Sequence, residues 1–196
     1  MKLKRRLLAL TAGLFAVMAL LFHQGDVNAA SLSSQVQLVV KATLTDTADL
    51  VTAEAPLVFQ QLLTMANGDA ANQASVVWSD TRTLAASGTE DLDLAGGGLT
   101  DPFGVAFAPA KIRALIVSAA STNTNNVVVG NKAAQVPYLG AVTESVAILP
   151  GGMVVLTAPA LAGIPVTATT GDLITVTNSA GGTGVTYSII ILGTAT

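Results

Sequence analysis

The chain has 196 residues, of which 51% are hydrophobic and only 11% are charged. Charged residues usually make up about 25% of a soluble domain, so the surface is expected to be rich in uncharged polar residues or partly covered by other subunits. The absence of cysteine excludes disulfides, thiol nucleophiles and cysteine metal sites. From Ala30 onward five basic residues stand against eleven acidic ones, and this excess of negative charge predicts no direct nucleic-acid partner.

The first thirty residues differ in kind from the rest. Four basic residues in MKLKRR precede an apolar run from Leu7 to Phe22, and small residues follow around Ala29. This order is typical of a secretory signal peptide, while the length of the run lies between that of a leader and that of a membrane span. Residues 1–30 are therefore interpreted as a signal-peptide-like or anchor segment, with a mis-assigned start or a buried arm as the remaining alternative. Membrane contact is expected only through Leu7 to Phe22, if the segment is not cleaved.

Residues 31–196 are predicted to form one domain, because no linker, charge block or low-complexity run divides them. Apolar residues alternate with polar ones from Val36 to Leu44, which predicts a half-buried strand. Residues 47–73 are ambiguous between a helix and a strand. Pro56 and the turn-forming residues 67–69 bracket the apolar part of this segment, and a strand is favoured.

The remaining segments alternate between short apolar runs and turn formers. Strands are predicted within residues 75–87, 89–97, 110–121, 127–129, 142–149 and 153–159, followed by three more within residues 163–193. The run within 110–121 is apolar on both faces, as in a central strand. Residues 142–149 and 153–159 flank Pro150, Gly151 and Gly152 and are predicted to pair as a hairpin. Nine to eleven short strands indicate an all-β chain folded as a single jelly-roll-like β-sandwich, preceded by a short N-terminal hydrophobic helix.

Few residues of the domain are suited to catalysis. The only histidine, His23, lies in the leader, which excludes catalytic triads and histidine-ligated zinc from residues 31–196. Four acids, Glu90, Asp91, Asp93 and Asp101, are close enough in sequence to bind calcium or to hydrolyse a glycoside. Asp91 and Asp93 alternate with leucines, however, which favours acids that simply face solvent. We therefore expect no enzyme, no catalytic or metal-binding residue and no cofactor.

Aromatic residues and one arginine complete the candidates. The aromatic side chains are interpreted as core and edge residues rather than as a sugar-stacking platform, because aromatics make up only 4% of the chain; they are Trp78, Phe103, Tyr138 and Tyr187. Arg82 is expected to pair with Asp80, two residues away on the same face of a strand.

Several strings resemble a group of small structural proteins encoded in tailed-bacteriophage and prophage genomes. They are WSDTRTLAASGTEDLDLAGGGLTDPFG, NTNNVVVG, PGGMVVLTAP and TGDLITVTNSAGGTGVTYSIIILGTA. The resemblance implies a non-enzymatic β-sandwich subunit located in a virion, as a capsid decoration protein or a head or neck surface subunit. The apolar and weakly charged composition separately predicts that the chain associates with copies of itself, in trimers or pentamers, or binds the lattice of the major capsid protein.

A second class of function follows from residues 1–30. Tailed-phage particles assemble in the cytoplasm, whereas a signal peptide directs export. The alternative is therefore a secreted, periplasmic or cell-surface β-sandwich that binds a ligand or mediates adhesion. A hydrolase that uses carboxylates alone is a third alternative.

Overall fold

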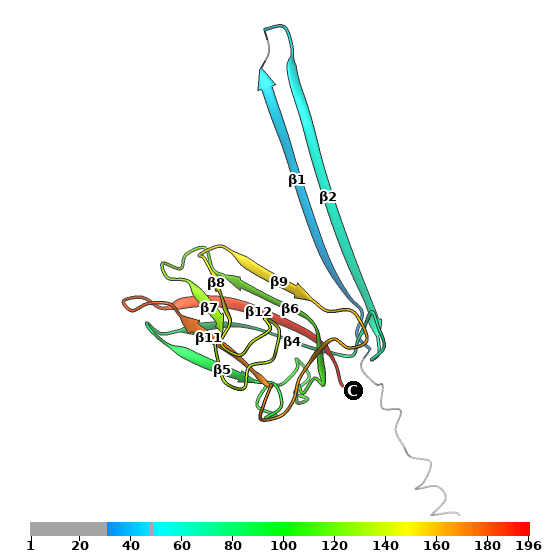
Figure 1. Cartoon of the computed structure of the whole chain (residues 1–196), viewed down its shortest axis with the longest axis vertical. Coiled ribbons are helices and arrows are strands. Elements are labelled where there is room, and N and C mark those ends of the chain that lie inside the picture. The colour runs from blue at the N-terminus through cyan, green and yellow to red at the C-terminus, as the bar shows by residue number, and fades with distance from the viewer. Residues whose placement is uncertain (1–30, 48) are drawn as a thin grey trace, which may run out of the picture. The chain divides into compact units, whose positions relative to one another are not determined.

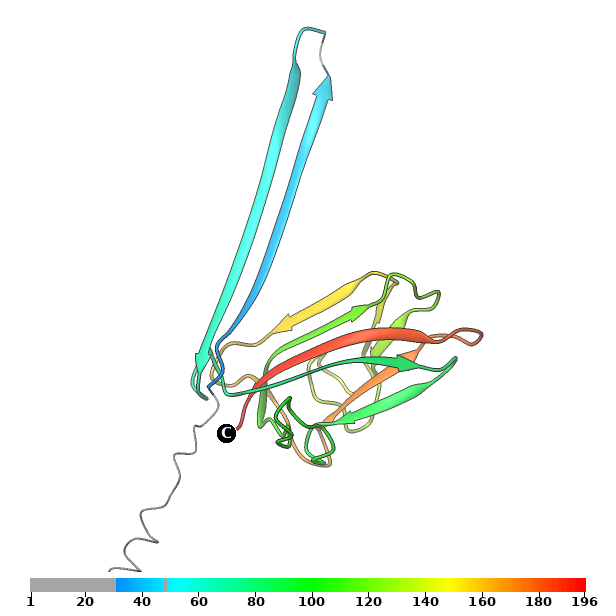
Figure 2. The ribbon, with the colours of Figure 1, turned by 180° about the vertical axis from the view of Figure 1, so that it is seen from behind.

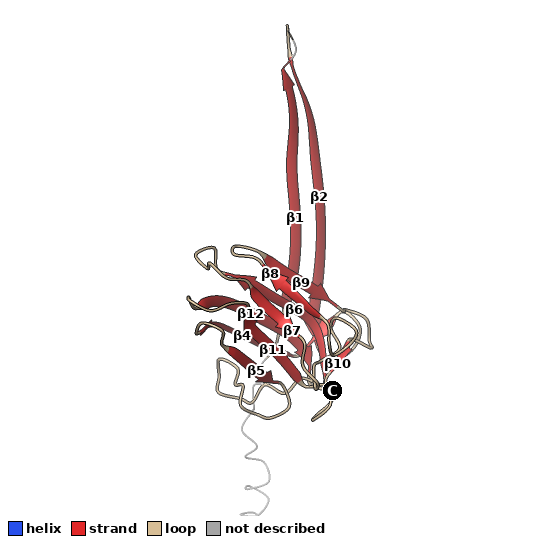
Figure 3. Cartoon of the chain, turned by 60° about the vertical axis from the view of Figure 1, so that its left-hand side comes forward, coloured by secondary structure: helices blue, strands red, loops and turns tan. Residues whose placement is uncertain are grey.

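A computed structural model describes residues 31–47 and 49–196. The predicted leader and its hydrophobic helix lie outside the described residues. The described chain is all-β (Figure 3), with the strands β1 Ser34–Thr47, β2 Thr52–Asn67, β3 Gln73–Ala74, β4 Val76–Leu84, β5 Thr89–Asp93, β6 Lys111–Ala119, β7 Val127–Gly130, β8 Ser145–Ile148, β9 Met153–Thr157, β10 Ile164–Pro165, β11 Leu173–Asn178 and β12 Val185–Thr194. Over these residues no helix is long and apolar enough to cross a membrane.

The strands form three sheets (Figures 1 and 2). One has three strands in the order β1-β2-β3, and a second has four in the order β5-β11-β7-β8. The third has five strands. Four of them follow the order β10-β6-β12-β4, and the fifth, β9, pairs with β6. Every named strand pair is antiparallel except β2 with β3. The four- and five-stranded sheets, with their loops, make up residues 75–196 and are called the two-sheet body below.

One apolar core is shared by the two sheets of this body. The five-stranded sheet contributes Leu115 and Val117 from β6 and Ile189 from β12, and the four-stranded sheet contributes Ile174 and Val176 from β11. The predicted central strand is confirmed, since four consecutive residues of β6, at positions 112–115, are buried. Burial on both faces explains why this segment shows no alternation of polar and apolar residues.

The short valine strand β7 lies between β11 and β8. Val127 and Val129 are buried in the shared core, while the asparagines before them hold the loop in place. Asn123 exchanges two hydrogen bonds with the backbone of Thr186, both 2.8 Å long, and the Asn125 amide donates to the Asn178 side chain over 3.0 Å. These hydrogen bonds pair the polar side chains of the loop that precedes the four-residue strand β7.

The predicted hairpin between residues 142 and 159 is wrong in its pairing. A turn does form there, with the Gly152 amide donating to the Leu149 carbonyl over 2.8 Å and with Gly151 at a φ of 75°. The strand before the turn, β8, pairs with β7 in the four-stranded sheet, whereas β9 pairs with β6 in the five-stranded sheet. The turn therefore carries the chain from one sheet to the other, because each sheet offers an edge strand for one of the two segments.

The first two strands form a long antiparallel hairpin. Pairing runs from Ser34 opposite Met65 to Thr47 opposite Thr52, which confirms the strand prediction for the ambiguous segment. The prediction that β1 is half-buried is wrong over most of its length, because every residue of β1 from 37 onward is exposed. Alternation along β1 correctly separates two faces, but the described residues place no second layer against either face beyond the root of the hairpin.

The root of the hairpin packs on the five-stranded sheet. Met65 and Ala74 are fully buried, and they form one apolar cluster with Ala114 of β6 and Leu192 of β12. Val36 is among the partly buried residues packed against this second, smaller cluster. The cluster joins the hairpin to the two-sheet body at one end of its strands and leaves the rest of the hairpin uncovered.

Candidate functional site

The four acids singled out in the sequence do not form one site. Glu90 lies in an ion-pair network, and Asp91 lies in another, where it accepts a hydrogen bond from the Thr175 hydroxyl over 2.6 Å and pairs with Lys132 at 2.8 Å. Burial raises the pKa of Asp91, but the hydrogen bonds and charge of its partners outweigh that effect and hold the pKa below its ordinary value. The acid is thus ionised and already paired.

The other two acids organise turns. Asp93 accepts hydrogen bonds from the amides of Ala95 and Gly96, at 2.9 and 2.7 Å. Asp101 accepts two from the amides of Phe103 and Val105, both at 2.9 Å. Short carboxylates commonly cap turns in this way. Over the residues that the structure describes, no group of three or more histidine, cysteine or acidic side chains is arranged to hold a metal ion.

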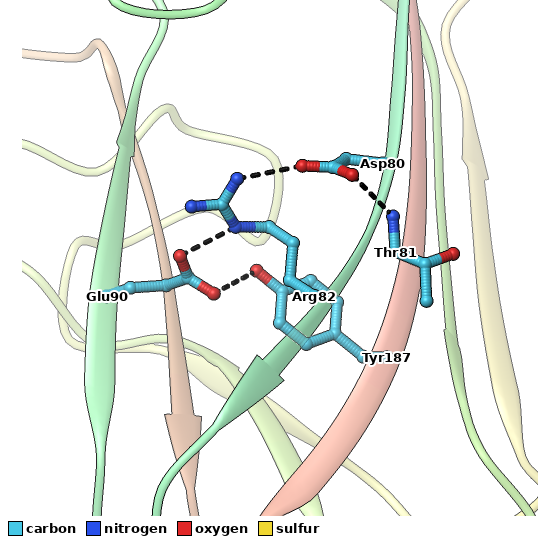
Figure 4. Close-up of polar contacts among 5 residues, drawn as sticks. All are labelled: Asp80, Thr81, Arg82, Glu90 and Tyr187. Carbon is cyan, nitrogen blue, oxygen red and sulfur yellow. Dashed lines mark hydrogen bonds and ion pairs between the residues drawn. The ribbon is translucent and has the colours of Figure 1, made fainter.

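Glu90 bridges the two sheets of the body, as Figure 4 shows. It comes from β5 of the four-stranded sheet, and its carboxylate accepts from Arg82 Nε of β4 and from the Tyr187 hydroxyl of β12, both at 2.7 Å. Arg82 also pairs with Asp80 at 2.9 Å, which confirms the pair expected from the sequence. Asp80 in turn accepts from the Thr81 amide over 2.8 Å. The network ties β5 to the facing strands β4 and β12.

The protonation states of this network suit a structural role. Burial, followed by the hydrogen bond to the Glu90 carboxylate, raises the pKa of Tyr187 well above its ordinary value. Burial lowers the pKa of Arg82, but the hydrogen bond and the charge of Glu90 raise it by more. The net effect is a pKa above the ordinary value, so the guanidinium stays charged. A phenol that keeps its proton and a carboxylate held by two donors are poorly suited to act as a general base or nucleophile.

The aromatic residues do not form a shared platform. Trp78 and Tyr187 are buried in the core, where Trp78 stacks on Phe107 with ring centroids 6.3 Å apart. Tyr138 is partly buried against the same core, while Phe103 is exposed on a loop. The interpretation of most of these aromatics as core residues is confirmed, and Phe103 is the exception.

A cluster missed by the sequence analysis secures the root of the hairpin. Arg113, on the central strand β6, is fully buried and donates hydrogen bonds to the carbonyls of Asp69, Ala70 and Ala160. These carbonyls belong to the loops at residues 68–72 and 158–163, so one guanidinium holds two loops together. A charge inside the apolar part of the strand, between Ile112 and Ala114, is the signal that could have revealed this role, since a buried charge requires partners.

The carboxylate of Asp69 binds the end of the chain at the same place. It accepts from the Ser75 hydroxyl at 2.6 Å and from the Thr196 hydroxyl at 2.8 Å. These hydrogen bonds, together with those from the backbone amides of Ala195 and Thr196, lower the pKa of Asp69 below its ordinary value. The loop that follows β2 is therefore fixed both to the centre of the five-stranded sheet and to the C-terminal residues.

Exposed apolar side chains gather on the hairpin. Ten of the large hydrophobic residues exposed in the described chain lie within residues 38–62. They are Leu38, Val39, Val40, Leu44, Leu50, Val51, Leu57, Val58, Phe59 and Leu62. Extended exposed apolar surface of this kind is typical of an interaction site. The hairpin is therefore the candidate functional site that the structure presents.

Comparison of the chain with protein-family models, with curated proteins and with solved structures finds no match.

Proposed function

We propose that this chain is a non-enzymatic structural subunit of a larger assembly, specifically a capsid decoration or head or neck surface subunit of a virion. The observation that carries the proposal is the long hairpin, β1 with β2, which is secured firmly at its root and exposes apolar side chains along its length. A subunit in an assembly has neighbours that cover such a surface, whereas a solitary molecule would leave it in water.

The strand order supports a jelly-roll sandwich for the body. The two-residue strand β10 is left out of the count, and the other strands of the body are numbered one to eight in chain order, from β4 to β12. One sheet then has the order 1-8-3-6 and the other has the order 2-7-4-5. Two four-stranded sheets whose strands alternate in this way are the arrangement of a double Greek key. Jelly rolls are common in viral capsid domains, but also in lectins and cupins. The fold therefore agrees with the proposal without selecting it.

The polar contacts of the body also favour a structural role. Each of the acids considered for catalysis holds a turn or an ion pair, as Glu90 does between Arg82 and Tyr187. Each of these carboxylates accepts at least two contacts from donors of the chain itself. This use of the carboxylates argues against the third alternative, a hydrolase that depends on them.

The location is tested by fractionating a culture that carries the gene. Particles are purified on a density gradient, and the gradient fractions and the cleared medium are analysed by mass spectrometry for peptides of residues 31–196. We expect the chain in the particle fraction at a constant ratio to the major capsid protein, with antibody labelling on the particle surface. Recovery of the chain only as free protein in the medium or cell envelope would contradict the virion role.

A second candidate is a secreted or cell-surface protein, and the order of basic, apolar and small residues within residues 1–30 favours it. The same fractions distinguish the two candidates. A chain that begins near Ala30 and is found outside the cell supports export, whereas peptides that contain Met1 in purified particles support assembly in the cytoplasm.

A further inference from the structure

The hairpin has two unlike faces. Successive side chains of a strand point to opposite sides, and residues directly opposite one another in the pair share a side. The register therefore places four cross-strand pairs on one face, namely Leu38 with Gln61, Val40 with Phe59, Ala42 with Leu57 and Leu44 with Ala55. We call these eight residues the apolar arm face. It contains one polar residue and no charge.

On the opposite face every pair joins one polar residue to one apolar residue, so half of its residues are polar; we call it the polar face. Its pairs over the same length are Gln37 with Leu62, Val39 with Gln60, Lys41 with Val58 and Thr43 with Pro56. Both faces are exposed, so the difference between them is not imposed by contacts within the described chain. A hairpin with one apolar and one polar face is expected where a second layer covers one side only.

The apolar arm face continues from a surface that is already covered. The pairs nearest the root on this side, Val36 with Leu63 and Ser34 with Met65, belong to or adjoin the buried cluster on the five-stranded sheet. Beyond Val36 the same face becomes exposed, with Leu44 at 75% and Leu57 at 56% exposure. The chain thus covers the root of this face itself and leaves the remaining eight residues uncovered.

The chemistry of the face fits a second copy of the chain. Five of its eight residues are large hydrophobic residues that are between 42% and 75% exposed, so two such faces would cover each other's apolar side chains. Aliphatic sheet faces pack on each other about 10 Å apart without needing charge complementarity. Since the face lacks charge, it is self-complementary and offers no specific contact to a charged partner. An isolated two-stranded hairpin is marginally stable, so packing would also stabilise it.

Pairing along the free edge of β2 fits less well. Pro56 is the fifth residue of β2, and a proline has no N–H to donate to an added strand. Prolines within an edge strand oppose continuous pairing with another chain. On the β2 side, the side chains of the face are therefore a better surface for a partner than the backbone of the edge.

We propose that copies of this chain associate by packing their apolar arm faces together, so that the hairpins form the interface between subunits. The inference rests on the proposed role in an assembly, but not on the location of that assembly in a virion. An associating protein found outside particles would contradict the virion role alone. A monomer found in particles would contradict the packing of the arms alone.

The test compares two matched triple variants of the full chain by sedimentation at several concentrations. One replaces residues of the apolar arm face, with Leu38→Thr, Leu44→Thr and Leu57→Thr. The control replaces exposed apolar residues of the polar face, with Val39→Thr, Val58→Thr and Leu62→Thr. Threonine preserves the preference for strand, so both variants keep the hairpin. We expect association at least tenfold weaker in the first variant and unchanged in the second.

A cross-linking measurement keeps the proposal testable if a triple variant fails to fold. The chain has no cysteine, so a single one can be introduced at Ala42→Cys on the apolar arm face or at Thr43→Cys on the polar face. A short bis-maleimide should link copies through the first position far more efficiently than through the second.

Four outcomes would overturn the inference. They are a wild-type chain that stays monomeric at micromolar concentration, equal effects of the two triple variants, equal cross-linking at the two positions, and flotation of the monomer with phospholipid vesicles that depends on the apolar arm face. Dissociation by Val155→Thr with Ile190→Thr, combined with no effect of the arm variant, would also overturn it. That result would place the interface on exposed residues of β9 and β12.

Discussion

At the scale of single residues, Tyr187 is the side chain whose hydroxyl links the two sheets most directly. Its hydrogen bond to Glu90 lies between β12 and β5, and the raised pKa means that the folded chain favours the protonated phenol. A raised pKa in the folded state gives stability that is fully present below the ordinary tyrosine value. That stability is lost as the pH rises through and above about 10.

We expect Tyr187→Phe to lower the free energy of unfolding by about 1 kcal/mol at neutral pH, because one buried hydrogen bond is lost while Glu90 keeps its bond to Arg82. The loss of stability above about pH 10 should also be smaller in the variant than in the wild type. Urea unfolding at neutral and alkaline pH measures both effects. Thr83→Val, which removes an exposed hydroxyl contact to Thr186, is the control and should change stability by less than about 0.5 kcal/mol.

The partners of Arg82 and Tyr187 show how far the local sequence predicts which side chains pair. Asp80 and Arg82 are two positions apart on one strand, and their pairing follows from the alternation of side chains. Glu90 also pairs with Arg82, and it meets Tyr187 from a strand almost a hundred positions further along the chain. No local pattern predicts that contact, because it depends on how the sheets face each other.

At the scale of elements, the attachment of the hairpin depends on β6. Arg113 is buried in that strand and supplies donors to the loop that follows β2 and to the loop at residues 158–163. Its replacement by an apolar residue would leave those carbonyls without their donors at a partly buried place. The cost of unpaired buried polar groups is about 1–3 kcal/mol each.

We expect Arg113→Met to destabilise the chain by about 3 kcal/mol and to increase hydrogen exchange at the backbone amides of residues 66–74. Both quantities are measured on the same protein, by urea unfolding and by exchange with mass spectrometry. Lys111→Met on the same strand is the control, because Lys111 is only partly buried and bonds through its ammonium to the Thr196 carbonyl at 3.2 Å. An Arg113 variant as stable and as protected as the control would contradict the anchoring role.

Two predictions from the sequence, the burial of β1 and the pairing of β8 with β9, differ from the structure. Alternation in residues 34–47 predicts a strand with two unlike faces, and both features are present. The burial of one face does not follow from alternation, because it requires a second layer, and the described chain supplies one only near Val36. Likewise the turn at Pro150 is visible in the sequence, whereas the separate sheets of β8 and β9 depend on the edges that β7 and β6 offer.

At the scale of the whole molecule, residues 31–196 form one compact unit. A chain that begins at Ser31 should therefore fold to a β-rich protein with the thermal midpoint of the full chain. Burial of the sixteen mostly apolar residues from Leu7 to Phe22 would contribute many kcal/mol at about 25 cal/mol per Å². Their loss would thus be evident if they belonged to the core.

Circular dichroism melting of the two proteins checks this expectation. Aggregation of the shorter chain, or the loss of its cooperative transition, would identify the segment as an integral arm rather than a leader. Association through the apolar arm face should be equal in the two proteins, because the hairpin is present in both.

The sequence by itself predicted that the residues the structure describes are all-β, where most of their strands lie and that β1 has two unlike faces. These properties depend on the alternation of side chains and on turn formers a few residues apart, as at Val127 and Val129 between asparagines and glycine. Only the tertiary structure decided which strands share a sheet, that Arg113 is buried, and that the apolar side of the hairpin is left uncovered. Those features depend on partners from distant parts of the chain, and alternation specifies that a face needs a partner without specifying which one.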